Sequence, residues 1–463
     1  MATEQASVIN VPAKPNQGFD AENAAVNRDD ASTQVKFSVA DLAIGRRLQF
    51  PIYEPAGLLL LAEGSIVTAR FKQLLVTRGI HAVILSQADA DGMASLAEPE
   101  VRLPVIAQLD NDLAKKLDAM VDAGQLFMKD SGPAFRDRMI QHGSKGYSRE
   151  RRELLLKEHT ETCSALDAMI KAAVNGHPPS ADKTAAVVAH YMTNLTSDAD
   201  CALEVARQAG HYAELAEHCL QMSLLGMAIG IEMGMAEEDI RNIGLSGLFH
   251  DWGMALVSPE IRHANRLVTR AEFLEIQKHP IHTLELLKSV SGIPSFVPLI
   301  CYQVHERPNG TGYPRGRERD NIHPCARILH VADAYLALSS PRPFRKALMP
   351  YAAIECLLRQ ARENLVDVDV VRALLHVLSL FPIGSLVKLS DGSTARVLRR
   401  NGSNYSSPIV LIVADANGDP TDSLDESQVI DPSRSNLKIV QALSSPDRNE
   451  VGLSPDIQVL NRD

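Results

Sequence analysis

A histidine and an aspartate stand side by side at His250-Asp251, at the end of an apolar helical run. If both side chains point inward, the carboxylate can bridge two cations while the imidazole holds one of them. Two cations about 3.5–4 Å apart are a common device for hydrolysing phosphate esters. The doublet therefore predicts a metal site if further ligands surround it.

Other candidate ligands occur on both sides of the doublet. The first two are four residues apart in a helical run at 212–233, so their side chains share one face. The full set comprises four histidines and three carboxylates: Glu214, His218, His250, Asp251, His279, His305 and Asp333. Because imidazole dominates, the set suits Fe, Mn, Zn or Ni better than Mg or Ca. A lone histidine on an apolar helix is more often a hydrogen-bonded core residue, so spacing alone leaves both interpretations open.

The helices expected to hold these ligands have clear sequence signals. Thr269 and Glu272 form a capping-box pattern, which predicts the start of the helix that carries His279. His305 ends a helical run that begins near residue 295, and Asp333 lies in an apolar helix at 326–338. The ligands are therefore expected to reach one site from several helices.

Length and composition limit the class of protein. At 463 residues the chain is long for one domain, so two to four domains are expected. The net charge of −10 argues against a partner that is a nucleic-acid polymer. The six cysteines form no CxxC pair and no signal peptide is visible, which favours reduced thiols and a cytoplasmic location. No apolar run reaches the roughly 18–20 residues needed to span a bilayer, so no membrane association is expected.

Changes in composition and periodicity predict a multidomain, mainly α protein. The charged run 149–153 suits a solvated helix face or a coiled-coil-like dimer stem, so a homodimer or a signalling partner could bind through the N-terminal or helical segment. The expected parts are a disordered tail at 1–34, a small α+β module at 35–87, a linker and helical segment at 88–180, an all-helical core at 181–380, a small β-barrel-like module at 381–443 and a polar tail at 444–463.

Several separate stretches resemble the HD-GYP family of metal-dependent phosphohydrolases, whose known members hydrolyse the second messenger cyclic di-GMP. The doublet is followed by Gly253, and a later loop reads Gly310-Thr311-Gly312-Tyr313-Pro314 after His305-Glu306-Arg307. The matching stretches also include Thr269, Glu272, His279-Pro280, Pro324, Ala326-Arg327-Ile328, Ala332-Asp333 and Arg342-Pro343-Phe344-Arg345. The resemblance covers about residues 195–380 and implies an all-helical HD-type core.

The resemblance also implies roles for individual residues. Asp251, with His250 beside it, would be catalytic and would bridge two divalent transition metals, Fe or Mn by preference, that activate a shared water. Glu214 falls where members with a third metal carry a glutamate. Gly312, Tyr313 and Pro314 would shape the substrate entrance, and the Arg342 and Arg345 guanidinium groups would contact phosphate. The metal-ligand positions of the family fall on His218, His250, Asp251, His279, His305 and Asp333.

The sequence departs from the family pattern at several positions. Met254 stands where the family has lysine, and Val304 where it has the first of two adjacent histidines. Asn309, Thr283 and Leu336 replace the usual Asp, Gly and Asp. The leading hypothesis is a phosphodiesterase that opens cyclic di-GMP to linear pGpG or to GMP. The alternatives are a degenerate domain that binds nucleotide or a partner protein without turnover, and a phosphohydrolase of another nucleotide.

Overall fold

The chain forms two compact units, Met1–Pro99 and Glu100–Asp463. Of the predicted tail at 1–34, residues 1–33 lie outside the described residues, as does most of the chain after residue 443. The protein is mainly α, as predicted, because 53% of its residues are in helices. Its sheets lie near both ends of the chain. The computed structural model describes residues 34–39, 42, 48–62, 65, 67, 69–87, 89–90, 111–125, 132–143, 145–208, 214–266, 268–341, 346–402, 404–421, 428–443 and 448–449.

The N-terminal unit is a small α+β module. Its antiparallel sheet has the order β1-β4-β2-β3 and packs with helix α1 over one apolar core. The buried Asp89 carboxylate accepts hydrogen bonds from the backbone nitrogens of Gln49 and Phe50 at 2.9 and 3.0 Å, which ties the loop before β2 to the end of β4. The elements are β1 (Gln34–Ser38), β2 (Ile52–Tyr53), β3 (Leu59–Leu61), α1 (Ala69–Thr77) and β4 (Ala82–Ser86).

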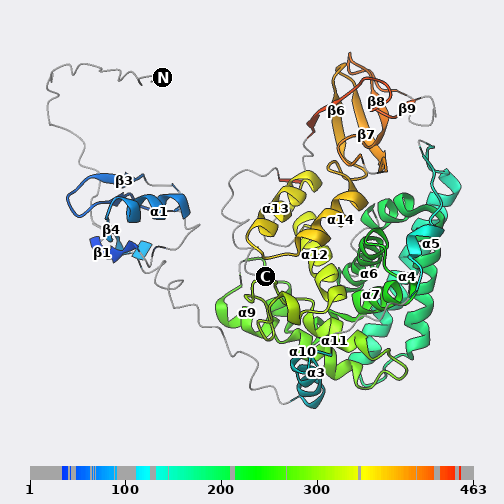
Figure 1. The fold of residues 1–463 in the computed structure, drawn as a ribbon, viewed down its shortest axis with the longest axis horizontal. Coiled ribbons are helices and arrows are strands. Elements are labelled where there is room, and N and C mark those ends of the chain that lie inside the picture. Colours follow the sequence, from blue (N-terminus) through cyan, green and yellow to red (C-terminus); the bar gives the residue numbers. More distant parts are fainter. Residues whose placement is uncertain are drawn as a thin grey trace, which may run out of the picture. The chain divides into compact units, whose positions relative to one another are not determined.

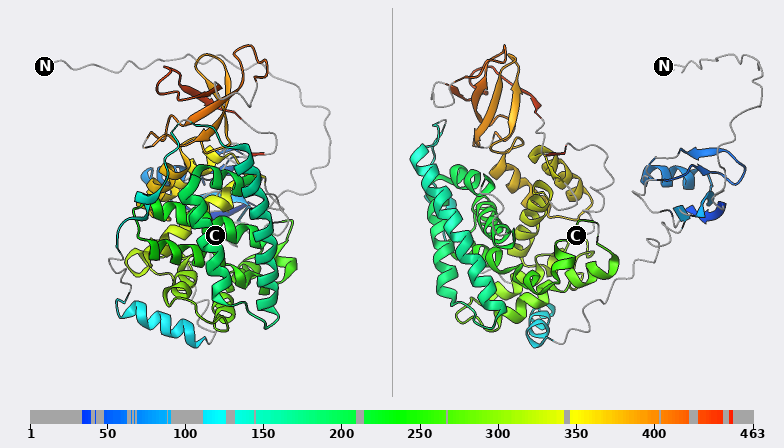
Figure 2. Two further views of the ribbon diagram at one scale, coloured as in Figure 1. Left: turned by 90° about the vertical axis from the view of Figure 1, so that its right-hand side faces the viewer. Right: turned by 180° about the vertical axis from the view of Figure 1, so that it is seen from behind.

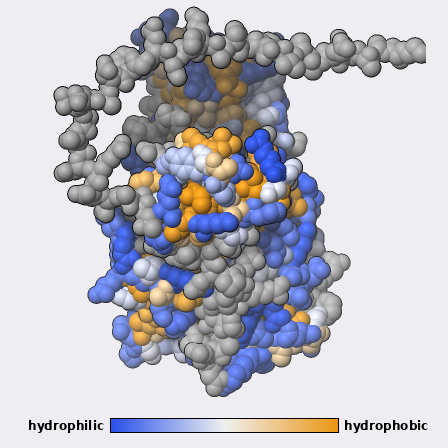
Figure 3. Space-filling view, turned by 90° about the vertical axis from the view of Figure 1, so that its left-hand side faces the viewer, coloured by the Kyte–Doolittle hydropathy of each residue, from blue (hydrophilic) through white to orange (hydrophobic). Residues whose placement is uncertain are grey.

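Some large apolar side chains of this unit are exposed. They include Leu58 and Leu59 at the edge strand β3, and Leu74 and Val76 on α1. Figure 3 shows apolar groups among hydrophilic ones on the surface that faces the viewer. A sheet edge with exposed leucines can pair with a further chain segment. In the described residues, β3 is one of the two edge strands of this sheet and β1 is the other.

The second unit is a helical body with a sheet at one end (Figures 1 and 2). Across the described residues, no helix is both long and apolar enough to cross a membrane. Its helices are α3 (Asp112–Asp122), α4 (Arg149–Val174), α5 (Ala181–Gln208), α6 (Glu214–Glu232), α7 (Glu237–Phe249), α8 (Pro259–Arg262), α9 (Arg270–Ile276), α10 (His279–Leu287), α11 (Phe296–Gln303), α12 (Pro324–Ser339), α13 (Pro350–Arg362) and α14 (Val368–Leu378), with short 3₁₀ turns η2 (Phe135–Arg138), η3 (Trp252–Leu256) and η4 (Arg319–Asn321).

Helix α6 lies in the middle of the helical core and is packed closely on two sides. A Cβ at Gly247 of α7 would lie 2.7 Å from the Ser223 backbone nitrogen, so the two helices touch through their backbones. On another side, Leu329 of α12 fills the space beside Gly226. The buried face of α4 joins the same core through Leu166 and Ile170. This packing fixes where α6, α7 and α12 can place their polar side chains.

The helix predicted to run from Thr269 through His279 is in fact two helices, α9 and α10. The capping box at Thr269 and Glu272 is present and starts α9, as predicted. Pro280 lies in the first turn of α10, where a missing N–H is tolerated. A proline in the interior of one long helix would break its hydrogen bonding, so the chain starts a new helix at His279.

The C-terminal module is a five-stranded antiparallel sheet with the order β10-β6-β7-β8-β9. The expected barrel is not confirmed, because within the described residues no ladder joins the two edge strands. The buried Arg399 holds this sheet to the helices through Asp198 of α5, with Nη1–Oδ1 and Nη2–Oδ2 distances of 2.7 and 2.8 Å. Its strands are β6 (Leu386–Leu389), β7 (Thr394–Arg399), β8 (Ile409–Ala414), β9 (Val429–Ile430) and β10 (Ile439–Ala442); separately, β11 (Arg448–Asn449) pairs with β5 (Ala347–Leu348).

Candidate metal centre

The predicted ligands converge from five elements. His218 lies in α6, His250 and Asp251 directly follow α7, and His279 begins α10. His305 follows α11, and Asp333 lies in the third turn of α12. Ligand atoms of His218, His250 and Asp251 lie within 4.8 Å of one another, and so do those of Asp251, His279 and His305. Asp251 therefore belongs to two candidate metal-binding triads at once.

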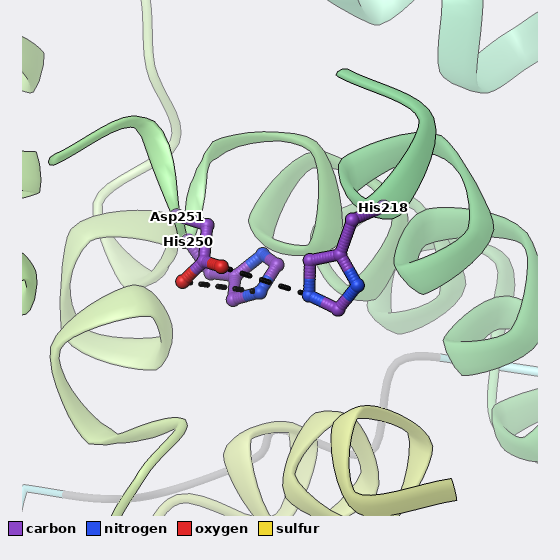
Figure 4. A group of neighbouring side chains, drawn as sticks. All are labelled: His218, His250 and Asp251. Atoms are coloured by element: carbon purple, nitrogen blue, oxygen red, sulfur yellow. Dashed lines mark ion pairs between the residues drawn. The ribbon is translucent and has the colours of Figure 1, made fainter. Parts of the chain in front are cut away.

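The distances place one carboxylate between two pairs of imidazoles. Asp251 Oδ2 lies 3.6 Å from His218 Nε2, and Oδ1 lies 3.4 Å from His250 Nε2. In the second triad, Oδ1 lies 3.2 Å from His279 Nε2 and 3.7 Å from His305 Nε2. Figure 4 shows His218, from α6, and His250 directed toward the Asp251 carboxylate. This arrangement lets one carboxylate contribute to two cations.

Backbone contacts orient two of the imidazoles. His250 Nδ1 lies 2.9 Å from the Gly247 carbonyl oxygen, and His279 Nδ1 lies 2.8 Å from the Ile276 carbonyl oxygen. A carbonyl oxygen only accepts, so the proton of each neutral ring resides on Nδ1. The lone pair of each Nε2 then faces the site, which is the form in which histidine binds a metal.

Burial and charge set the protonation states of the site. Burial lowers the pKa of His250 to about 4, so this imidazole is neutral near pH 7. Burial alone would raise the pKa of Asp251, but His250 and His279 outweigh it and hold that pKa well below its ordinary value. The pKa of Asp333 is lowered in the same way by His218 and His305. A neutral imidazole at His250 and ionised carboxylates at Asp251 and Asp333 are the ligand states that a cation requires.

Two buried polar atoms of the site lack a hydrogen-bond partner among the described residues. They are His250 Nε2 and Asp251 Oδ1. His279 Nε2 and His305 Nε2 lie 2.9 Å apart, within hydrogen-bond distance, and both face the Asp251 carboxylate. Unsatisfied buried polar atoms are unfavourable unless something binds them. A divalent first-row metal fits this set of imidazole and carboxylate donors, so the residues present fit the metal that the sequence predicts.

Comparison with known proteins agrees with this geometry. A family model described as an HD domain matches residues 171–370. The chain is 31% identical over 196 residues, 42% of its length and 47% of the relative's, to a cyclic di-GMP phosphodiesterase of Pseudomonas aeruginosa. The chain contains an HD-GYP domain. It is also 26% identical over 236 residues, 51% of its length and 61% of the relative's, to a cyclic di-GMP phosphodiesterase of Borreliella burgdorferi.

A third relative is named for a different cyclic dinucleotide. The chain is 29% identical over 167 residues, 36% of each protein, to a 3′3′-cGAMP-specific phosphodiesterase of Vibrio cholerae. The chain spans about half the length of the first two relatives, 47% and 61%. The resemblance to the HD-GYP family is thus confirmed for the domain, and metal dependence is a property of HD domains.

The structure describes the side chain of Asp333 but not that of Glu214. Asp333 Oδ1 lies 3.4 Å from His218 Nε2, and Oδ2 lies 3.6 Å from His305 Nδ1, so this carboxylate connects the two triads. His218 and Asp333 are 25% and 20% exposed, whereas His279 is 3% exposed, which makes this the open side of the site. Glu214 begins α6, but its side chain lies outside the described residues, so the predicted third metal stays a prediction.

The loop at 309–317 of the HD-GYP domain covers the second triad, which consists of Asp251, His279 and His305. The Tyr313 ring stacks on His305 with centroids 4.9 Å apart and planes 6° apart, and its backbone nitrogen donates to the His305 carbonyl at 3.1 Å. A Cβ at Gly312 would lie 2.5 Å from that carbonyl oxygen, so only glycine permits this approach. The buried Pro314 follows. The predicted role of these residues at the substrate entrance stays a prediction.

Sequence reasoning missed the residues that hold this loop. Glu306 is almost fully buried, and its two carboxylate oxygens accept from the backbone nitrogens of Arg315 and Arg317, each at 2.7 Å. Burial raises the pKa of Glu306 to about 7. Its position directly after His305 was the one available signal.

The predicted phosphate-binding arginines cannot be placed. Arg342 and Arg345 lie outside the described residues, so their role stays a prediction. Arg315, Arg317 and Arg327, which add positive charge to the same part of the sequence, each pair with a carboxylate: the first two with Asp118 and the third with Asp367. These three guanidinium groups therefore form ion pairs within the fold.

The residues that depart from the family pattern lie in different environments in the structure. The Val304 side chain is fully buried in the apolar core. Asn309 Oδ1 accepts from the backbone nitrogen and the hydroxyl of Thr311 at 3.1 and 2.7 Å, a role that needs only an acceptor. Leu336 is buried in the core and Met254 is half-buried. The Thr283 hydroxyl joins two elements of the site, a role that the sequence did not reveal.

Proposed function

We propose that this protein is a metal-dependent phosphodiesterase that opens cyclic dinucleotides, with cyclic di-GMP as its substrate and linear pGpG or GMP as its product. The supporting observation is the position of Asp251, whose carboxylate takes part in two candidate metal-binding triads. A two-cation site of this kind suits the hydrolysis of a phosphodiester. The names of the most similar relatives point to the same reaction and to this class of substrate.

Each residue has a distinct task in this proposal. A pair of divalent ions, Fe or Mn by preference, would supply positive charge for the phosphate oxygens and activate water. Asp251 would bridge the pair, with His218 and His250 on one ion and His279 and His305 on the other. Asp333, which contacts His218 and His305, would hold the open side in register. Tyr313 covers the His305 ring and so limits access from that side.

A degenerate domain without turnover is not favoured. Both triads are complete without a ligand at position 304, whose valine side chain belongs to the apolar core. Met254 lacks the charge of the lysine that the family carries at this position, and we expect this to weaken phosphate binding rather than metal binding. Cytoplasmic location and a homodimer or partner contact through the N-terminal unit or residues 88–180 stay predictions.

The test is turnover by the full chain, loaded with Fe²⁺ or Mn²⁺ under anaerobic conditions. Cyclic di-GMP and 3′3′-cGAMP are compared as substrates, and products are separated by chromatography. The negative control is Asp251→Asn, and the matched control is Asp182→Asn at an exposed position of α5. Linear product from wild type and Asp182→Asn, but not from Asp251→Asn, supports the proposal.

Two results would contradict it. Equal product from wild type and Asp251→Asn would place the activity elsewhere. An inert wild type with its full metal content would favour the non-catalytic alternative. Faster turnover of 3′3′-cGAMP than of cyclic di-GMP would retain the reaction and change the substrate.

A further inference from the structure

Helix α3 packs on the two helices that lead to the second triad, although it lies outside the matched domain at 171–370. Its buried face comprises Ala114, Leu117 and Val121. These three side chains form one apolar cluster with four residues of α10 and α11, namely Ile281, Leu284, Leu299 and Tyr302. Figure 1 shows α3 beside α10 and α11. Since α10 begins with His279 and α11 precedes His305, α3 supports both elements that supply this triad.

A carboxylate on α3 holds the loop of the HD-GYP domain. Asp118 Oδ2 lies 2.8 Å from Arg315 Nη2, and Oδ1 lies 3.0 Å from Arg317 Nη2. The Tyr302 hydroxyl donates to Asp118 at 3.3 Å and accepts from Arg315 Nε at 2.9 Å. The side chains of Asp118 and Arg317 are only 15% and 18% exposed, so solvent screens this pairing less than it would at an open surface.

The same two arginines are therefore held twice. Glu306 accepts from their backbone nitrogens, and Asp118 pairs with their side chains. They follow Tyr313 by two and four residues, and Tyr313 stacks on His305 and lies edge-on to His279, with ring centroids 6.0 Å apart. Anchoring the arginines fixes the end of the loop that covers the second triad.

We propose that Asp118 is a positioning residue of the site: from outside the HD domain it fixes the loop at 309–317 and thereby the place of Tyr313 over His279 and His305. Its effect on substrate rests on the proposed function, whereas its effect on the loop does not. The loop has only nine residues, so the loss of one anchor is transmitted directly to the tyrosine.

The experiment compares Asp118→Asn with Asp112→Asn in the full chain. Asp112 lies in the first turn of the same helix and is exposed, so the second variant controls for charge and for helix stability. The first readout is amide hydrogen exchange of residues 309–317 in metal-loaded protein. We expect roughly tenfold faster exchange in Asp118→Asn alone, because the anchored loop opens more often.

The second readout is the steady-state kinetics of cyclic di-GMP hydrolysis. We expect KM to rise about tenfold in Asp118→Asn, at the low end of effects typical of residues that orient a site from outside it. Metal content and kcat should stay close to those of wild type, because Asp118 pairs with the loop arginines. Asp118→Glu should return KM part of the way to the wild-type value. A purely structural role would lower the unfolding temperature and leave KM unchanged.

The outcomes separate this inference from the proposed function. Unchanged loop exchange, or faster exchange with an unchanged KM, overturns the role of Asp118. If wild type turns over no cyclic dinucleotide, the proposed function fails, and loop exchange alone decides whether Asp118 fixes the loop. If Asp118→Asn does not fold, Arg315→Gln removes the pair with Asp118 from the loop side and takes its place in both readouts. Arg317→Gln is less specific, because Arg317 also pairs with Asp122.

Discussion

Replacing Thr283 by valine tests how the His250-Asp251 segment is held in place. The Thr283 hydroxyl accepts a hydrogen bond from Gly253 N at 2.9 Å and donates one to the His250 carbonyl at 2.8 Å. The two segments are in direct contact, since a Cβ at Gly253 would lie 2.1 Å from the His279 carbonyl oxygen. One side chain on α10 thus connects the ends of the two triads.

The expected loss follows from the number of groups left unsatisfied. Valine matches threonine in shape but provides neither the donor nor the acceptor, and Thr283, His250 and Gly253 are all buried. Each buried polar group without a partner is unfavourable by about 1–3 kcal/mol. For two such groups, Thr283→Val should lower the free energy of unfolding by about 2–6 kcal/mol. The shifted doublet should also bind metal about 10–100-fold more weakly.

Urea unfolding followed by the emission of Trp252 measures this loss. Trp252 is the single tryptophan, is fully buried and follows Asp251, so it reports on this segment. The matched control is Thr184→Val: Thr184 is equally buried, but its hydroxyl makes one local bond, to the Ala181 carbonyl at 2.9 Å. We expect a loss of about 1 kcal/mol there, and a small loss in Thr283→Ser. If Thr283→Val is no less stable than Thr184→Val, the bridging role is refuted.

Three further predictions concern the ligands, an aspartate and the thiols. His218→Ala and His279→Ala should each lose about half of the bound metal, and Asp251→Asn nearly all of it, because only Asp251 serves both triads; metal analysis by mass spectrometry after equilibrium dialysis measures this, and equal losses in all three would contradict two sites. Burial, opposed by Arg400 and Arg399, raises the pKa of Asp200 from 3.8 to about 6. The folded state therefore holds this proton more tightly, and the stability it provides is complete below pH 3.8 and is lost as the pH rises through about 6. Wild type should lose up to about 3 kcal/mol more than Asp200→Asn over this range in urea titrations, and parallel curves would refute the assignment. All six cysteines are buried, and burial raises the pKa of Cys163 and Cys201 to about 12, so thiol labelling at pH 8 should modify none in native protein and six in urea; rapid labelling of native protein would contradict this.

Residue type and order sufficed to choose residues that the structure brings together. His218, His250, Asp251, His279, His305 and Asp333 were chosen from helical periodicity and from the order of the family pattern, and the structure brings them together. Ligands on apolar helices are predictable because burial of the apolar face directs them inward. The break between α9 and α10 could also have been read from Pro280, since proline suits the first turn of a helix and not its interior.

Contacts between distant parts of the chain were out of reach of such reasoning. Asp118 and Arg315 are 197 residues apart, and neither lies in a periodic pattern that would pair them. The C-terminal sheet shows the same limit: alternating residues and turn signals predicted strands, but whether a sheet closes depends on pairing between its first and last strands. In the described residues the two edges, β9 and β10, stay apart.

The departures from the family pattern argue for adaptation at the site. At position 309 the asparagine still supplies the oxygen that Thr311 requires. At position 283, where the family has glycine, the threonine hydroxyl satisfies two backbone groups of the opposite segment. At position 304 the valine fills the apolar core beside a histidine that still reaches Asp251. A site that had lost its task would not be expected to keep unpartnered ligand atoms such as His250 Nε2 and Asp251 Oδ1 buried, because they are unfavourable without a metal.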